Sequence, residues 1–415
     1  LFVVEHDLDV IRHADWIVDV GPAAGQHGGR ILYSGPPAGL AKIEASCTRV
    51  HLFDEALEAP REPRTPATWL ELAAIKRHNL TGLDAKFPIG LLTSVTGVSG
   101  SGKSSLVSQA LVELVSQALG HEDLAETDDA EDAVIDPTEG KIAGGLAGVE
   151  RLVVVDQKPI GRTPRSNLAT YTGLFDHVRK LFASTKQAKA RKYDAGRFSF
   201  NVAKGRCEKC EGEGFVFVEM LFLPSVYAPC PVCHGARYNA KTLEITVRDK
   251  SIADILAMTV DDAFAFFADE PPIRRALEVV RQVGLGYLRL GQPATELSGG
   301  EAQRIKLATE LQRAQRGTTL YILDEPTTGL HPSDVEKLLA QLDALVAAGN
   351  TVILVEHEMR VVAASDWVID LGPGAGDQGG EIIAAGPPAV VAQARGSKTA
   401  PYLRAYLERR ARRAA

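Results

Sequence analysis

The sequence is poor in the features that mark membrane-spanning and secreted proteins. No apolar run approaches the ~18 residues of a membrane-spanning helix, and no secretory signal opens the chain. There are only five cysteines. Four form two close pairs and Cys47 stands alone, which is not the pattern of a disulfide framework. We therefore expect a cytoplasmic protein that needs no membrane.

Positive charge is scarce overall but concentrated locally. The 415 residues carry a formal net charge of −7. Residues 121–139 hold nine acids and no Lys or Arg, which is typical of a solvated loop, whereas 177–210 hold ten Lys or Arg against two acids. An acidic average therefore does not exclude nucleic acid. The hydrophobic content of 45% is ordinary for a globular chain of about two to four domains.

One glycine-rich stretch has the pattern of a phosphate-binding loop. Residues 97–104 fit G-x-x-x-x-G-K-[ST] between an apolar run and an apolar-periodic segment, so the loop should join a buried strand to a helix. Its N–H groups would converge on phosphate, Lys103 would reach the β- and γ-phosphates, and the Ser104 hydroxyl would bind Mg²⁺. A plain Gly/Ser-rich turn is the alternative. The nucleotide-binding candidates are Gly97, Gly100, Gly102, Lys103, Ser104 and Ser105.

The two ends of the chain share a repeated pattern. Its matches are Val4-Glu5-His6 with Val355-Glu356-His357, Asp15-Trp16-Ile17-Val18-Asp19 with Asp366-Trp367-Val368-Ile369-Asp370, Gly21-Pro22 with Gly372-Pro373, and Gly35-Pro36-Pro37 with Gly386-Pro387-Pro388. All four lie at one offset of 351 residues, which indicates an internal duplication. Residues 1–45 are thus predicted to be the C-terminal tail of a first copy whose body lies upstream.

Strands that alternate with helices predict an α/β fold with a mostly parallel sheet. Two strands, at 70–80 and 85–98, should lead to the phosphate loop. The predicted organisation is a linker at 46–68, a core at 69–175 and 291–395, a signature and insertion region at 176–290 with a zinc module at 205–238, and a basic tail at 396–415.

Two further motifs are typical of nucleotide chemistry. Asp324 and Glu325 end an apolar strand, at the edge where parallel sheets bind ligands. Asp324 would hold Mg²⁺ through its water shell, and Glu325 would take a proton from the water that attacks the γ-phosphate. Ser298, Gly299 and Gly300 open a periodic helix whose N-terminus can approach a phosphate. Ser298 and Glu301 also fit a capping box, and both interpretations can hold together.

The cysteine pairs have the spacing of a four-thiolate zinc site. Cys207-x₂-Cys210 and Cys230-x₂-Cys233 are separated by 19 residues, with glycines and prolines that suit tight turns. Two redox dithiols are the alternative. Because four sulfurs already complete a tetrahedral shell, we expect a structural zinc and leave His234 outside it.

Basic and aromatic residues alternate between Arg179 and Arg206, next to the cysteine pairs. Such a run is either an ordinary solvated surface or a contact surface for duplex DNA, whose phosphates need Lys or Arg. The candidate contacts are Lys186, Lys189, Arg191, Lys192, Arg197, Lys204 and Arg206.

In their order along the chain, these motifs resemble the ATP-binding-cassette superfamily. The resemblance implies that Gln157 is the Q-loop glutamine and a second Mg²⁺ ligand, that 297–301 is the signature, and that His357 is the switch histidine. It implies ATP hydrolysis with Glu325, His357 and Gln157 as catalytic residues. In that superfamily the signature of one cassette closes over the ATP of another, so residues 1–415 alone are expected to bind ATP but hydrolyse it poorly.

A closer resemblance is to the UvrA family of bacterial nucleotide excision repair. It is carried by the stretches Asp156 to Asn167, Gly196 to Asn201, the cysteine module, and Leu297 to Arg304 with Asp324 to His331. The resemblance implies a two-cassette ATPase that binds damaged double-stranded DNA as a homodimer and hands the lesion to UvrB. The family's UvrB-binding region lies in the first cassette, outside this chain.

Departures from the family pattern are modest, and none removes a catalytic residue. They are Lys158, Ser105, the acidic loop and the basic residues from Arg409 to Arg413. Two alternatives stay open at this point: a UvrA-like protein of drug or intercalator resistance without a repair role, and an ATPase subunit of a transporter.

Overall fold

The computed structural model describes residues 1–22, 28–53, 62–120, 137–219, 226–313 and 318–414. They form two compact units. Unit 1 contains residues 1–22, 29–156 and 315–415, and unit 2 consists mainly of 157–314. These boundaries differ from the expected ones at 175 and 291, because the chain from Gln157 through the signature helix packs as one body. Residues 121–136 of the expected acidic loop lie outside the described residues.

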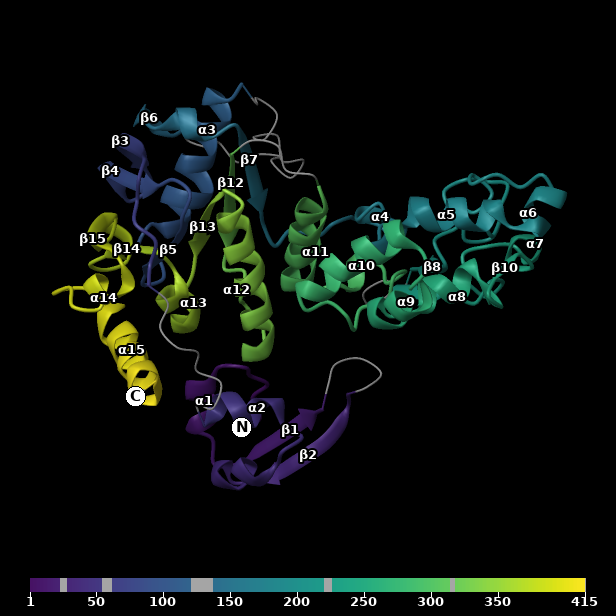
Figure 1. The fold of residues 1–415 in the computed structure, drawn as a ribbon, viewed down its shortest axis with the longest axis horizontal. Helices are drawn as coiled ribbons and strands as arrows, with labels where there is room; N and C mark the ends of the chain where they lie inside the picture. Colours follow the sequence, from purple (N-terminus) through teal and green to yellow (C-terminus); the bar gives the residue numbers. More distant parts are fainter. Residues whose placement is uncertain (23–27, 54–61, 121–136, 220–225, 314–317, 415) are drawn as a thin grey trace. The chain divides into compact units, whose positions relative to one another are not determined.

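A six-stranded sheet lies at the centre of unit 1 (Figure 1). Its order is β15-β14-β5-β13-β12-β7, and every pairing is parallel except that of the edge strand β15. All residues of β5 and β13 are buried, as is usual for central parallel strands covered on both faces. The expected mostly parallel sheet is confirmed. The bounds are β5 (Leu92–Gly97), β7 (Arg151–Val155), β12 (Thr319–Asp324), β13 (Thr351–Val355), β14 (Trp367–Gly372) and β15 (Glu381–Gly386).

Helices of unit 1 pack on this sheet through regularly spaced apolar residues. The helix after the phosphate loop contributes Val107, Leu111 and Val115 to a core shared with Ile322 and Ile353. The expected basic tail forms a helix, α15, whose Leu403 is fully buried. The helical segments are η3 (Ser105–Leu111), α3 (Val112–Ala118), η5 (Leu146–Gly148), α12 (Pro332–Ala347), α13 (Met359–Ala364), η7 (Gly376–Gln378), α14 (Pro388–Val391) and α15 (Ala400–Ala414).

A second, antiparallel sheet in unit 1 has the order β4-β3-β6. Its strands are β3 (Trp69–Arg77), β4 (Leu80–Pro88) and β6 (Glu139–Gly144). The expected single strand at 85–98 is therefore wrong. It is divided between β4 and β5 by a turn at Gly90, where φ is 75°.

The repeated sequences at the two ends of the chain form matching hairpins. Strand β1 (Ile17–Gly21) pairs with β2 (Arg30–Gly35) as β14 pairs with β15: Ile17 faces Gly35, and Val368 faces Gly386. Each hairpin also has a register shift at the same place, after Asp19 and after Asp370. The remaining N-terminal elements are α1 (Leu8–Arg12), η2 (Pro37–Lys42) and α2 (Cys47–Leu52), so part of the expected linker is a helix capped by Ser46.

Within the described ranges, none of the chain's helices has the length and apolar character needed to cross a bilayer.

Unit 2 is mainly helical and carries a small hairpin of β8 (Phe215–Val218) and β9 (Val226–Pro229). The other elements of unit 2 are α4 (Leu168–Tyr171), α5 (Leu174–Ser184), α6 (Lys186–Ala190), α7 (Ala240–Leu243), β10 (Thr246–Val247), β11 (Lys250–Ser251), α8 (Ile252–Ala257), α9 (Val260–Phe266), α10 (Pro271–Gln282), η6 (Ala294–Glu296) and α11 (Gly299–Gln312).

Candidate nucleotide site and cysteine cluster

The glycine-rich loop follows the central strand β5 and requires its glycines. The backbone of Gly97, Gly100 and Gly102 has φ of 136°, 77° and 104°, a region that side chains disfavour. A Cβ at Gly97 would also lie 2.2 Å from the carbonyl oxygen of Leu371. The path of this loop therefore requires glycine at these positions.

Lys103 is buried against this loop. Its Nζ donates to the carbonyl oxygens of Gly97 and Val98, both at 2.9 Å. Burial lowers the pKa of Lys103, and the carboxylates of Glu325 and Asp324 act in the opposite direction. The ammonium is therefore held over the loop that is expected to bind phosphate. Ser104 is exposed at the start of the helix, and Ser105 Oγ lies 3.0 Å from His78 Nδ1.

A second loop, absent from the sequence predictions, braces the first. Gly376 N donates to Gly100 O at 3.0 Å and Gly380 N donates to Ser101 O at 2.9 Å. Asn79 Nδ2 donates to both Gly100 O and Gly376 O at 3.2 Å. The signal for this loop was available in the repeated Gly-Pro at Gly372-Pro373, but no pattern pointed to Asn79.

The acid pair ends β12, beside the switch histidine at the end of β13. His357 Nε2 lies 3.3 Å from Glu325 Oε1, and both residues line a pocket of roughly 930 Å³ together with Gly97 and Val98. Burial lowers the pKa of His357, assisted by the charge of Lys103. Glu325 has φ of 44°, and its N–H donates to Val355 O. An unusual backbone at a candidate catalytic residue is typical of functional sites.

Asp324 is set one position earlier and has a different partner. Its Oδ2 accepts from Ser108 Oγ at 3.1 Å, a contact that the sequence did not predict. Burial raises the pKa of Asp324, with a smaller contribution from Glu325. The structure thus brings the phosphate loop, Asp324, Glu325 and His357 to one edge of the sheet.

The signature residues and Gln157 belong to unit 2. Ser298 caps α11 in the expected capping box: Glu301 N donates to Ser298 Oγ at 3.3 Å, and Ser298 N donates to Glu301 Oε2 at 2.8 Å. Tyr287 donates to the other oxygen of Glu301 at 2.6 Å, which fixes this carboxylate further. A Cβ on Gly299 would lie 3.2 Å from Gln157 Oε1, so Gln157 packs against the start of the signature helix.

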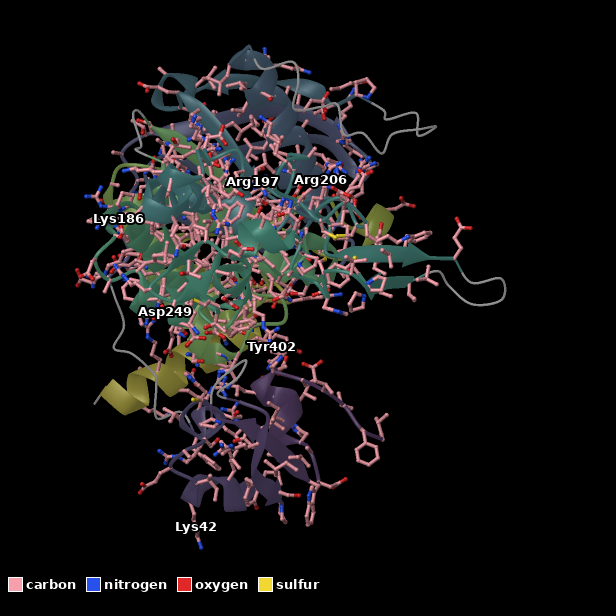
Figure 2. All side chains as sticks on the ribbon, turned by 90° about the vertical axis from the view of Figure 1, so that its right-hand side faces the viewer. Lys42, Lys186, Arg197, Arg206, Asp249 and Tyr402 are labelled. Atoms are coloured by element: carbon pink, nitrogen blue, oxygen red, sulfur yellow. The ribbon has the colours of Figure 1, made fainter. Side chains whose placement is uncertain are left out.

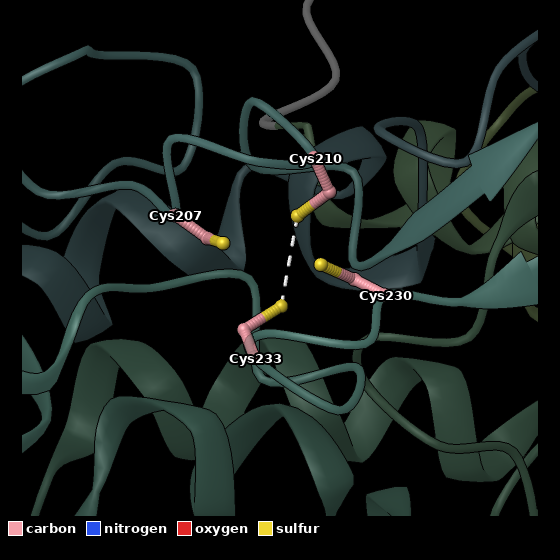
Figure 3. A group of neighbouring side chains, drawn as sticks. All are labelled: Cys207, Cys210, Cys230 and Cys233. Carbon is pink, nitrogen blue, oxygen red and sulfur yellow. Dashed lines mark hydrogen bonds between the residues drawn. The ribbon is translucent and has the colours of Figure 1, made fainter.

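The four paired cysteines point into a common centre (Figure 3). Their sulfur atoms all lie within 4.8 Å of one another, and Cys210 Sγ is 3.6 Å from Cys233 Sγ. The two turns are alike, because Glu211 and His234 follow the second cysteine with φ of 49° and a positive-φ glycine follows each of them. No other cluster of possible metal ligands occurs in the described ranges, and His234 is outside this one.

The cysteine cluster fits zinc. Tetrahedral Zn–S bonds of about 2.3 Å place sulfurs about 3.8 Å apart, close to the separation of Cys210 and Cys233. Burial raises the pKa of Cys210 and raises that of Cys233 to about 12, whereas burial at Cys230 is outweighed by hydrogen bonds from backbone N–H groups, which lower its pKa to about 7. Ionisation of all four thiols together therefore needs a cation. Arg237 connects the cysteine module to the rest of unit 2, because its guanidinium donates to Pro164 O at 2.9 Å and to Gly291 O at 3.1 Å.

Comparisons with known proteins agree with this constellation. The chain is 50% identical over 409 residues to UvrABC system protein A of Clostridium acetobutylicum, and 51% identical over 406 residues to that of Mycobacterium tuberculosis. These matches cover 98% and 97% of the chain. The crystal structure of UvrA2 from Deinococcus radiodurans superposes with a TM-score of 0.90 at 66% identity, over 97% of this chain and 48% of that one. No protein-family model matches the chain.

The chain is similar to these UvrA proteins over the part of them that it spans. That part is 42% of the length of the Clostridium relative and 41% of the Mycobacterium one. The resemblance predicted from the motifs is confirmed, as is the α/β fold of an ATP-binding cassette.

The seven predicted DNA-contact residues lie in unit 2 and divide into two groups, and three of them are labelled in Figure 2. Three arginines have structural partners: Arg191 pairs with Glu244, Arg206 pairs with Glu211, and Arg197 donates to Thr242 Oγ1 while it stacks on Tyr193. The lysines are exposed, and Lys186 projects at the margin of the view in Figure 2. They are Lys186, Lys189, Lys192 and Lys204.

Proposed function

We propose that this chain is the second ATP-binding cassette of a DNA-damage-recognising ATPase of bacterial nucleotide excision repair. The carrying observation is the grouping of Lys103, Glu325 and His357 at one edge of a parallel sheet, in a chain that also has the four-cysteine module. The protein would bind damaged double-stranded DNA as a homodimer in the cytoplasm and couple ATP binding and hydrolysis to lesion search and to loading of UvrB.

In the proposed reaction, the N–H groups of the phosphate loop and Lys103 bind the β- and γ-phosphates. Glu325 takes the proton from the attacking water, and His357 orients Glu325 through their 3.3 Å contact. Ser104, and Asp324 through the water shell, would hold Mg²⁺, which would neutralise charge that develops on the phosphates. Gln157 is the further Mg²⁺ ligand that the family resemblance implies. Ser298, Gly299 and Gly300 would contact the nucleotide of another cassette, so residues 1–415 alone are proposed to bind ATP and hydrolyse it slowly.

Zinc would be held by Cys207, Cys210, Cys230 and Cys233 and would stabilise the fold of the module that presents the basic surface. The exposed lysines of unit 2 support a DNA contact, because phosphate neutralisation by Lys and Arg dominates duplex binding.

The test is binding of lesion-bearing and undamaged duplex over a range of salt concentrations, together with ATP hydrolysis and rescue of a repair-deficient bacterial strain by the longer protein. We expect tighter binding to damaged duplex and rescue. Equal affinity for both duplexes at every salt concentration would contradict damage recognition, even with ATP hydrolysis intact.

A further inference from the structure

Glu356 is a buried carboxylate beside the switch histidine. Its side chain is 2% exposed and accepts four hydrogen bonds. Oε1 accepts from Thr327 N at 3.0 Å and from Thr327 Oγ1 at 2.7 Å. Oε2 accepts from His357 N at 2.9 Å and from Glu358 N at 3.3 Å. All four partners are donors, which suits an ionised carboxylate.

These hydrogen bonds join the two segments that follow the paired strands β12 and β13. Thr327 lies two residues after Glu325, on the turn that leaves β12, and His357 is the second residue of the loop that leaves β13. The side chains of Glu325 and His357 lie 3.3 Å apart, yet each comes from a different segment. Beyond the last paired residues of β12 and β13, Glu356 adds a side-chain link between the two backbones that carry the pair.

The N-terminal repeat contains the same hydrogen bonds between a glutamate and the loop that carries the histidine. Glu5 occupies the position equivalent to Glu356, and its Oε2 accepts from His6 N at 3.1 Å and from Asp7 N at 3.4 Å. The bonds to the histidine loop are thus an intrinsic property of a Glu-His pair. In the second copy, the bonds to Thr327 also connect this loop to the turn after β12.

Burial makes the ionised form of the Glu356 carboxylate unfavourable. It raises the pKa of Glu356 to about 7, although the hydrogen bonds from Thr327, Glu358 and His357 lower it. A neutral residue of similar size would fill the same space with a smaller desolvation cost. The four acceptor contacts, rather than packing, therefore distinguish an acid from a neutral residue of similar size at this position.

We infer that Glu356 is a positioning residue for ATP hydrolysis, which holds His357 in register with Glu325 by tying the histidine loop to Thr327. This inference rests on the proposed ATPase function. Glu356 itself does not reach the reacting atoms and acts through His357.

The experiment measures ATP hydrolysis with the full chain in excess over ATP, together with nucleotide affinity, for Glu356→Gln, Thr327→Val and Thr327→Ser. Because displacement by about 1 Å lowers rates about 100-fold, we expect Glu356→Gln to lower the hydrolysis rate about 10- to 100-fold. Nucleotide affinity should change less than about threefold, which is under 0.7 kcal/mol. Thr327→Val should show a smaller loss of rate, and Thr327→Ser should restore it.

The double variant Glu356→Gln with His357→Ala tests whether Glu356 acts through His357 or through the stability of the whole site. If Glu356 acts through His357, the double variant is no slower than His357→Ala alone. An equal further loss in the double variant, or a parental rate for Glu356→Gln, overturns the inference.

Absence of hydrolysis by the parent chain would contradict the proposed function instead. Amide hydrogen exchange then decides the inference: Glu356→Gln must speed exchange at Thr327 and His357 together, and unchanged protection at both overturns it.

Discussion

His357 Nε2 and Glu325 Oε1 lie 3.3 Å apart because their strands are neighbours in the sheet. Strands β12 and β13 are parallel and in register, with Asp324 opposite Val355. Two residues that are 32 positions apart in the chain therefore leave the same edge side by side. This contact places an imidazole against the carboxylate that is proposed to act as the base.

Glu325→Gln should allow nucleotide binding and stop hydrolysis. The amide keeps the size of the side chain but cannot take a proton, so the rate should fall at least about 100-fold. Single-turnover hydrolysis and ATP affinity measure the two effects, with the exposed Glu150→Gln as a matched control. Normal hydrolysis in Glu325→Gln would remove Glu325 as the base.

Lys103→Ala should weaken ATP binding by about 100-fold, because the variant cannot make charged hydrogen bonds to the phosphates. Equilibrium titration with a fluorescent ATP analogue measures the affinity. The matched control is Lys141→Ala, which removes an exposed lysine of the same unit and should bind as the parent does. Parental affinity in the Lys103 variant would contradict a phosphate-binding role for the loop.

The purified chain should contain about one equivalent of zinc, and serine at Cys210 or Cys233 should remove it. Metal analysis and thiol titration before and after chelation measure this. Cys47→Ser is the matched control, because Cys47 is exposed and outside the cluster. Zinc at full occupancy in the Cys210 variant would argue against a four-thiolate site.

Alanine at Lys186, Lys189, Lys192 and Lys204 together should weaken binding to any duplex and flatten its salt dependence. For every DNA phosphate that the variant no longer neutralises, the slope of log affinity against log salt should become shallower by about 0.9. Fluorescence anisotropy over a salt series measures the slope. The control replaces four exposed lysines of unit 1, and an equal effect there would point to general charge: Lys42, Lys76, Lys86 and Lys141.

Unit 1 should lose stability between pH 6.5 and pH 4 through His51. Burial lowers the pKa of this imidazole to about 4, with smaller contributions from Arg360 and His331, and Arg360 Nη1 lies 3.3 Å from His51 Nδ1. The unfolded chain binds this proton near pH 6.5 and the folded chain does not. The stability is therefore present above pH 6.5 and is lost as the pH falls towards 4.

Urea unfolding at about pH 7.5 and about pH 4.5 tests this prediction. The loss due to His51 is at most about 2.5 kcal/mol, and His51→Gln should remove that part of the pH dependence. His13→Gln, at an exposed histidine of the same unit, should keep it. Identical pH dependence in the His51 variant and the parent would show that His51 does not carry it.

The local turns expected from motifs with fixed spacing agree best with the structure. The phosphate loop and the cysteine pairs are local, so a few consecutive residues determine the backbone turns, as the positive φ angles at Gly97, Gly212 and Gly235 show. Strand boundaries predicted from apolar runs were less accurate. The run at 85–98 contains both β4 and β5, because burial alone does not distinguish one long strand from two short strands around a glycine turn.

Contacts between residues that are far apart in the chain could not be predicted from the sequence. Asn79 against the phosphate loop, Ser108 against Asp324 and Glu356 against Thr327 all join residues from different elements. No sequence pattern identifies these residues. A polar residue at the end of a strand is the same letter in the sequence whether or not a partner from another segment lies next to it.

The amino-acid order alone was enough to propose the chemistry of this chain: a phosphate loop, an acid pair, a signature, a switch histidine and four zinc-binding thiols. Each of these is a short pattern whose residue types have few other uses in combination. The folded arrangement was needed to show which of these groups meet. Sheet register places Glu325 beside His357, and packing assigns Arg191, Arg197 and Arg206 to structural partners while four lysines stay exposed. These outcomes depend on the positions of segments far apart in the chain, which local residue patterns do not encode.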